Sequence, residues 1–140
     1  MLRTNTITKP VGSAARSFRF GMGFWAALAE LRSLELDQLL PVAAAANFAK
    51  SPHFLRARAD VLYCAALCHC ETEGMPQDFT RADALDWMDE MSGTDQAEVA
   101  GLALTTTSNL WGGKSLAEVI QAANAPAETT PTKPKKSAKS

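Results

Sequence analysis

One long helix with clear start and stop signals constrains the fold of this chain more than any other feature. Ser51 followed by Pro52 is typical of a helix N-cap and of a proline at the first helical position. Gly74 is typical of a helix end. No residue within this helix or after it is placed as catalytic residues usually are, so the pattern favours a small helical binding protein over an enzyme.

Helical spacing within this segment separates an apolar stripe from a polar one. The stripe predicted to be buried contains Phe54, Val61, Leu62, Ala65, Cys68 and His69. Arg56, Arg58 and Asp60 are predicted to face water.

Similar periodicity predicts five further helices, several of them with capping signals. Thr80 with Asp83, and Ser115 with Glu118, have the spacing of a capping box. Asp37 is expected to cap the second helix, and Ser92-Gly93 to end the fourth. The predicted helices run from Met22 or Phe24 to Glu35, from Asp37 to Phe48, from Thr80 to Ser92, from Thr94 or Asp95 to Leu110, and over residues 116–123.

The expected fold class is all-α, a small domain of about five to six helices with a possible short N-terminal strand at Phe18-Arg19-Phe20. Residues 1–17 are predicted to be a flexible N-terminal segment, because Pro10 and Gly12 interrupt any helix there. Residues 18–124 form the predicted helical domain. Residues 125–140 are rich in Lys, Pro and Thr, a composition that cannot build a core, and we expect them to be disordered.

Charge is strongly segregated although the net charge is only -1. Residues 1–29 contain no acid, whereas nine acids and a single base, Arg81, lie between Glu71 and Glu98. This pattern suits self-association or capture of a basic partner. Nucleic-acid binding is not expected, because the basic tail at Lys133–Lys139 has no aromatic residues and the folded part is acidic. No apolar run reaches the roughly 20 residues that span a membrane.

Cys64, Cys68, His69 and Cys70 lie close together in the sequence and invite a metal-site interpretation. On one helix, however, Cys64 and Cys68 lie about 40° apart, and Cys70 lies about 200° from Cys68. Such ligands cannot converge on one tetrahedral ion. We therefore expect no metal or other cofactor and interpret the cysteines as buried small apolar residues. Their odd number favours a reducing cytoplasm, and a metal- or thiol-based regulator remains an alternative.

Two helices carry the apolar and acidic side chains most suited to contact a partner. On the first helix these are Phe24, Trp25 and Leu28. On the fourth helix, the apolar residues Trp87, Met88 and Met91 alternate with acids. The expected partner-binding residues are Phe24, Trp25, Leu28, Asp86, Trp87, Met88, Asp89 and Met91.

The order of these segments resembles the tail assembly chaperones of long-tailed bacteriophages, the small helical proteins encoded just before the tape measure protein. The resemblance runs over roughly residues 18–110. It rests on Phe18-Arg19-Phe20-Gly21, on Ala27, Leu28 and Leu31, on Leu62-Tyr63-Cys64-Ala65-Ala66-Leu67, on the segment from Phe79 to Glu90, and on the polar tail.

The resemblance implies a non-catalytic protein of the host bacterial cytoplasm. Such a chaperone keeps the tape measure protein soluble, promotes assembly of the tail tube around it, and is absent from the mature virion. The family also implies a frameshift-extended form that recruits the tail tube protein. A helical structural connector or adaptor of a phage particle is the alternative within the same class.

Overall fold

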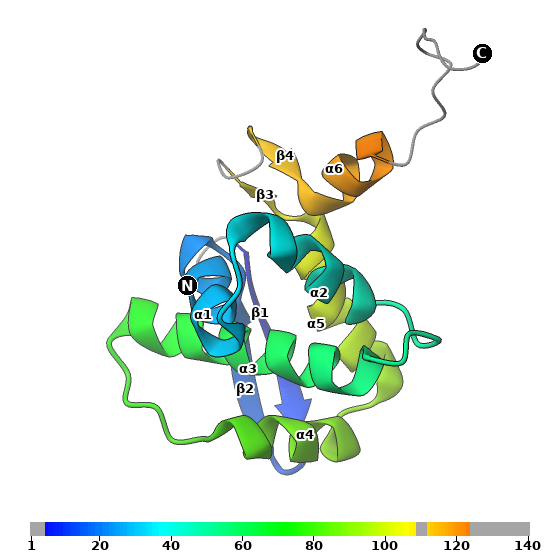
Figure 1. Ribbon diagram of the computed structural model, residues 1–140. Coiled ribbons are helices and arrows are strands. Elements are labelled where there is room, and N and C mark those ends of the chain that lie inside the picture. Colours follow the sequence, from blue (N-terminus) through cyan, green and yellow to red (C-terminus); the bar gives the residue numbers. More distant parts are fainter. Residues whose placement is uncertain (1–4, 109–111, 124–140) are drawn as a thin grey trace, which may run out of the picture.

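The computed structural model describes residues 5–108 and 112–123 and shows a mostly helical fold built around an N-terminal β-hairpin. In Figure 1 the hairpin lies in the middle, with α3 running across it and α4 below. A second pair of short strands and α6 lie together at the opposite end from α4. The elements are β1 (Thr6–Val11), β2 (Ala14–Arg19), α1 (Met22–Arg32), the 3-10 turn η1 (Leu36–Gln38), α2 (Leu39–Ala45), α3 (Phe54–Glu73), α4 (Arg81–Glu90), α5 (Gly93–Thr105), β3 (Thr107–Ser108), β4 (Lys114–Ser115) and α6 (Leu116–Ala123).

The six helices of the described residues confirm the predicted helical character, but the fold is not purely all-α. β1 pairs antiparallel with β2, so the expectation of a flexible segment over residues 1–17 is wrong for residues 6–17. Gly12 has a φ of 65°, which glycine adopts without strain and which suits a tight hairpin loop. Val11 and Ala14 form the strand pair next to the turn. Hydrogen-bonded and non-hydrogen-bonded pairs alternate along an antiparallel hairpin, so the backbone nitrogen of Pro10 points away from β2 and needs no hydrogen there. Pro10 and Gly12, which the sequence pattern indicated as helix breakers, are therefore residues that suit the edge and the turn of a hairpin.

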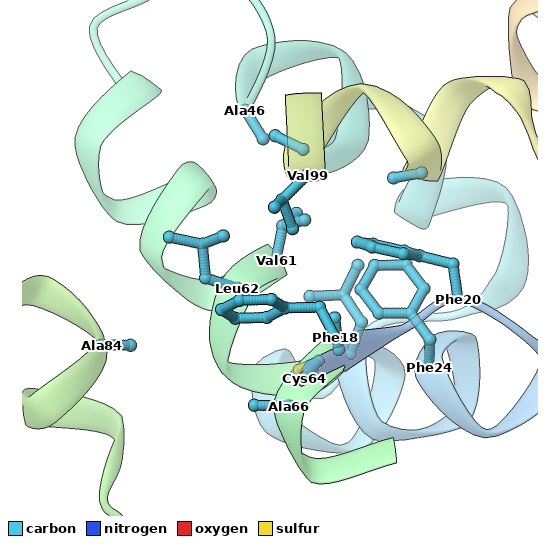
Figure 2. Packing of buried hydrophobic residues seen from close by; sticks show 14 of the residues in the cluster. Phe18, Phe20, Phe24, Ala46, Val61, Leu62, Cys64, Ala66, Ala84 and Val99 are labelled. Carbon is cyan, nitrogen blue, oxygen red and sulfur yellow. The ribbon is translucent and has the colours of Figure 1, made fainter. Parts of the chain in front are cut away.

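The core forms where the hairpin meets α1, α3 and α5. Phe18 of β2 and Phe20, just after this strand, are fully buried, and the ring centroids of Phe20 and Phe24 lie 4.8 Å apart. Figure 2 shows these aromatic rings beside Val61 and Leu62 of α3. Burying an aromatic or large aliphatic side chain stabilises a fold by about 1.5–3 kcal/mol. Docking the hairpin against the helices therefore contributes substantially to stability.

α3 is the central helix, as predicted, but it begins later than its start signal suggested. Gly74 ends it with a φ of 68°, which confirms the predicted stop. Ser51 and Pro52 lie in the preceding turn, where the hydroxyl of Ser51 accepts a hydrogen bond from the backbone N–H of His53. The sequence signal thus marks the turn that leads into the helix, and the first helical residue is Phe54.

Two residues of α3 predicted to face water are buried. Arg58 is 8% exposed and Asp60 is 3% exposed, whereas Arg56 is exposed as predicted. The Nε of Arg58 donates to the carbonyl of Ala46, and its guanidinium lies over the ring of Phe54. The prediction failed because α3 is contacted by α1, α2, α4, α5 and β2, so even its polar side is covered. Each buried charge is accommodated by a specific partner.

Side-chain caps explain where α4, α5 and α6 begin. Both predicted capping boxes are confirmed: Thr80 and Asp83 exchange backbone-to-side-chain hydrogen bonds, and so do Ser115 and Glu118. Ser92 was expected to end the fourth helix, but its hydroxyl accepts from the Asp95 N–H and caps α5.

The second predicted helix is divided into two elements. Glu35 and Gln38, rather than Asp37, form the capping box that starts η1, and α2 follows over seven residues. The fifth helix was predicted to reach Leu110, but α5 ends at Thr105 and the strand β3 follows at Thr107. Leu110-Trp111 itself and the predicted disordered tail at 125–140 lie outside the described residues.

A candidate partner-binding groove

An apolar groove lies on the outer side of α1, where η1 and the start of α2 fold back beside it. Its volume is about 320 Å³ and its lining is almost wholly apolar. Trp25 and Leu39 are buried and form its floor, whereas Met22 and Leu36 are 50% and 45% exposed at its rim. The lining residues are Met22, Trp25, Ala26, Ala29, Leu36 and Leu39.

Local sequence explains why a groove forms here. Met22, Trp25, Ala26 and Ala29 recur at spacings of three and four, so they share one face of α1. The two alanines are small and leave space beside the larger side chains. Ser33 then adopts a left-handed conformation with a φ of 54°, which ends α1 and returns the chain so that Leu36 and Leu39 form the opposite wall.

Acidic residues are the chain neighbours of residues that line this groove. Glu30 follows Ala29 on α1, and Glu35 and Asp37 flank Leu36, all three being exposed. Within the described residues none of these three carboxylates takes part in an ion pair. The nearby base, Arg32, is directed to Asp60 instead. An apolar groove with uncompensated negative charge at its edges is complementary to an apolar segment flanked by Lys or Arg.

The predicted contact residues of α1 only partly coincide with this groove. Phe24 and Leu28 are fully buried against the hairpin and α3, so they are core residues and not a contact surface in this fold. Trp25 lines the groove. The prediction missed the other five lining residues, Met22, Ala26, Ala29, Leu36 and Leu39. Ala26 and Ala29 had a usable signal, because they continue the helical spacing of Met22.

The predicted contact residues of α4 are similarly divided between core and surface. Trp87 and Met91 are each 5% exposed, and Met88 is half-buried. The Arg16 guanidinium lies 4.6 Å from the centroid of the Trp87 ring, so the hairpin covers this aromatic side chain. Asp86 and Asp89 are exposed as expected. The outer face of α4 therefore offers negative charge without an apolar anchor from Trp87.

A second cavity, of about 270 Å³, adjoins the buried carboxylate of Asp60. Arg32 Nε donates to Asp60 Oδ2 at 2.8 Å, and Arg81 donates through Nε to Oδ1 at 2.9 Å and through Nη2 to Oδ2 at 2.8 Å. Both oxygens of Asp60 are therefore bound by guanidinium groups. This cluster connects the end of α1 and the start of α4 to α3, a structural role that the sequence analysis missed by assigning Asp60 to the surface.

The cysteines lie inside the fold. Cys64, Cys68 and Cys70 are free and buried, as predicted. Burial raises the pKa of the Cys64 thiol from 9.0 to about 12, and burial likewise raises the pKa values of Cys68 and Cys70. Thiol chemistry requires the thiolate, so these raised pKa values weigh against the alternative of a thiol-based regulator. Within the described ranges, no group of three or more His, Cys, Asp or Glu side chains is arranged to hold a metal ion.

Comparison with known proteins gives no family to draw on: no family model, curated protein or solved structure matches this chain. None of the helices in the described part combines the length and the apolar character needed to cross a membrane.

Proposed function

We propose that this chain is a non-catalytic tail assembly chaperone of a long-tailed bacteriophage. In this role it binds an apolar helical stretch of the tape measure protein, keeps that protein soluble and promotes assembly of the tail tube around it. It acts in the host bacterial cytoplasm and is not retained in the mature virion. A frameshift-extended form would recruit the tail tube protein.

The apolar groove on α1 carries this proposal. Amphipathic helices bind grooves of this kind by inserting apolar side chains spaced at three and four residues. The exposed rim residues Met22 and Leu36 suit varied partner surfaces, because methionine in particular adapts its shape. The groove replaces Phe24 and Leu28 as the apolar contact on α1.

The charges support the same role. The groove has three nearby acids that can form ion pairs with basic residues of the partner helix: Glu30, Glu35 and Asp37. Such charge complementarity aligns the partner helix in the groove and increases the rate of association. Asp86 and Asp89 add exposed negative charge on α4, away from the core, which favours solubility of the free chaperone.

Co-expression with the long helical protein encoded by the following gene tests the proposal. The wild-type chain should increase the soluble yield of that protein, and the two should co-purify. The variant Ala26→Arg, which introduces a long charged side chain at an exposed position of the groove, should abolish the increase. The matched control Ala97→Arg changes an exposed alanine on α5 and should retain full activity.

Two outcomes would contradict the proposal. One is an equal soluble yield with and without the wild-type chain. The other is full activity of a folded Ala26→Arg variant. Mass spectrometry of purified virions distinguishes the alternative, because a structural connector would be present in stoichiometric amount and an assembly chaperone would be absent.

A further inference from the structure

A second exposed apolar surface lies at the corner between α2 and α3. Phe48 is 57% exposed and Leu55 is 63% exposed. Among the exposed large apolar side chains of the described residues, these two are the most exposed. Phe48 follows the end of α2 and Leu55 lies in the first turn of α3, so the two residues flank one connecting turn.

The charge of this corner is opposite to that of the groove. Residues 38–59 contain no Asp or Glu. Lys50 and Arg56 are exposed on either side of the turn, and neither takes part in an ion pair within the described ranges. Arg58 adds no free charge at the surface, because it is buried against Ala46 and Phe54. We call the surface formed by Phe48, Lys50, Leu55 and Arg56 the basic corner.

The basic corner and the acidic-edged groove lie at different ends of the molecule. Figure 1 shows α1 on the left and the α2–α3 connection projecting at the right. The two surfaces therefore cannot meet within one chain, although each has the apolar character and the charge that the other needs. A contact between different surfaces of identical chains is heterologous and repeats from copy to copy.

We propose that copies of this chain assemble head to tail, with the basic corner of one copy seated in the groove of the next. Phe48 and Leu55 supply the apolar side chains that enter the groove beside Met22 and Leu36. Lys50 and Arg56 face the groove carboxylates of Glu30, Glu35 and Asp37 in the neighbouring copy. Charge complementarity between two surfaces of the same chain selects a second copy as the occupant.

This inference does not depend on the identity of any other partner. The same groove is the proposed site for the tape measure protein, so assembly and partner binding would exclude each other. The test uses the purified chain alone, and its failure would leave the co-expression result unaffected.

The experiment measures mass against protein concentration by sedimentation velocity and light scattering. The wild-type chain should show a mean mass that rises beyond two copies with concentration and falls with added salt. One variant carries Lys50→Glu and Arg56→Glu; the other carries Glu30→Lys and Glu35→Lys. Each variant alone should associate roughly tenfold or more weakly, because like charges then face each other across the interface.

Mixing the two variants provides the decisive measurement. The acidic corner of one variant then faces the basic groove of the other, and the unchanged surfaces also remain complementary, so association should return. The control Glu71→Lys with Glu90→Lys reverses exposed charges on α3 and α4, outside both surfaces, and should assemble like the wild type. Circular dichroism confirms that each variant is folded.

Three results would overturn the proposal. The first is a wild-type chain that stays monomeric at every concentration. The second is an assembly that stops at two copies, which indicates an isologous interface. The third is an assembly without the expected charge dependence. In that case neither double charge-reversal variant associates more weakly than the wild type, or the two variants fail to associate when mixed.

Discussion

Replacing Asp60 with asparagine should strongly destabilise this protein. The Asp60 side chain is only 4% exposed and connects three helices through Arg32 and Arg81. Asparagine keeps the volume and one acceptor oxygen but removes the charge. Its amide group then presents N–H donors to guanidinium groups that have no acceptor capacity.

The magnitude follows from three hydrogen bonds between charged groups. Each such bond contributes about 1.5–3 kcal/mol when its partners are buried. The side chains of Arg32 and Arg81 are 24% and 48% exposed, so water compensates part of the loss. Breaking a buried ion pair by removing one partner costs about 3–5 kcal/mol. Asparagine keeps one oxygen that can still accept a hydrogen bond, so the expected loss of unfolding free energy for Asp60→Asn is near the lower end, about 3 kcal/mol. For a chain of this size that corresponds to a fall in Tm of roughly 10 °C.

Urea unfolding, followed by circular dichroism and tryptophan fluorescence, measures this effect. The transition midpoint should move to lower urea with an unchanged slope. Asp86→Asn provides the matched control, because Asp86 is exposed on α4 and should change stability by less than about 0.5 kcal/mol. A loss below about 0.5 kcal/mol for Asp60→Asn would refute the view that this carboxylate holds α1, α3 and α4 together.

Two further predictions concern α3. The pKa of Cys64 is about 12 in the folded protein and 9.0 in the unfolded chain. The thiol of the unfolded chain therefore loses its proton at lower pH, and the stability of the fold should decrease as pH rises from 9 towards 12. Urea unfolding across this range should show a smaller decline in Cys64→Ala, and an equal decline would contradict the assignment. Gly74→Ala should cost about 1 kcal/mol through its φ of 68°, since nothing lies within 4 Å of an added Cβ. Thermal unfolding measures the effect, and Gly93→Ala is the control, because Gly93 lies in a helix with open space around it and an ordinary φ. Equal losses of stability in the two variants would count against backbone strain at Gly74.

Local sequence signals predicted the helices well where they involve residues close together in the chain. The capping boxes at Thr80 and Ser115 and the stop at Gly74 were correct, because a cap joins groups only three or four residues apart. Signals that end one element and start the next were less specific. α4 ends at Glu90, close to the stop predicted at Ser92, but Ser92 also caps α5, which was expected to open at Thr94 or Asp95.

The hairpin was predicted only in part: the expected strand at Phe18-Arg19-Phe20 overlaps β2, but β1 was missed because its pairing is stabilised by distant residues. Two short strands gain little by themselves and need a packed face. Phe18 supplies that face against Trp87 of α4, and Lys9 forms ion pairs with Asp95 and Glu98 of α5. These partners are separated from the hairpin by about half of the chain or more, so no short window of sequence contains the evidence for the hairpin.

The sequence by itself determined a small, mostly helical fold, its central helix, its main caps and the burial of its cysteines. Helical periodicity and capping carry this information because they depend on backbone geometry within a few turns. Only the tertiary structure decided which polar residues are buried and which apolar residues remain exposed. Asp60 is buried because Arg32 and Arg81 converge on it, and the groove beside Ala26 exists because the chain turns back after Ser33. Burial depends on every element packed around a residue, and that arrangement is a property of the whole fold.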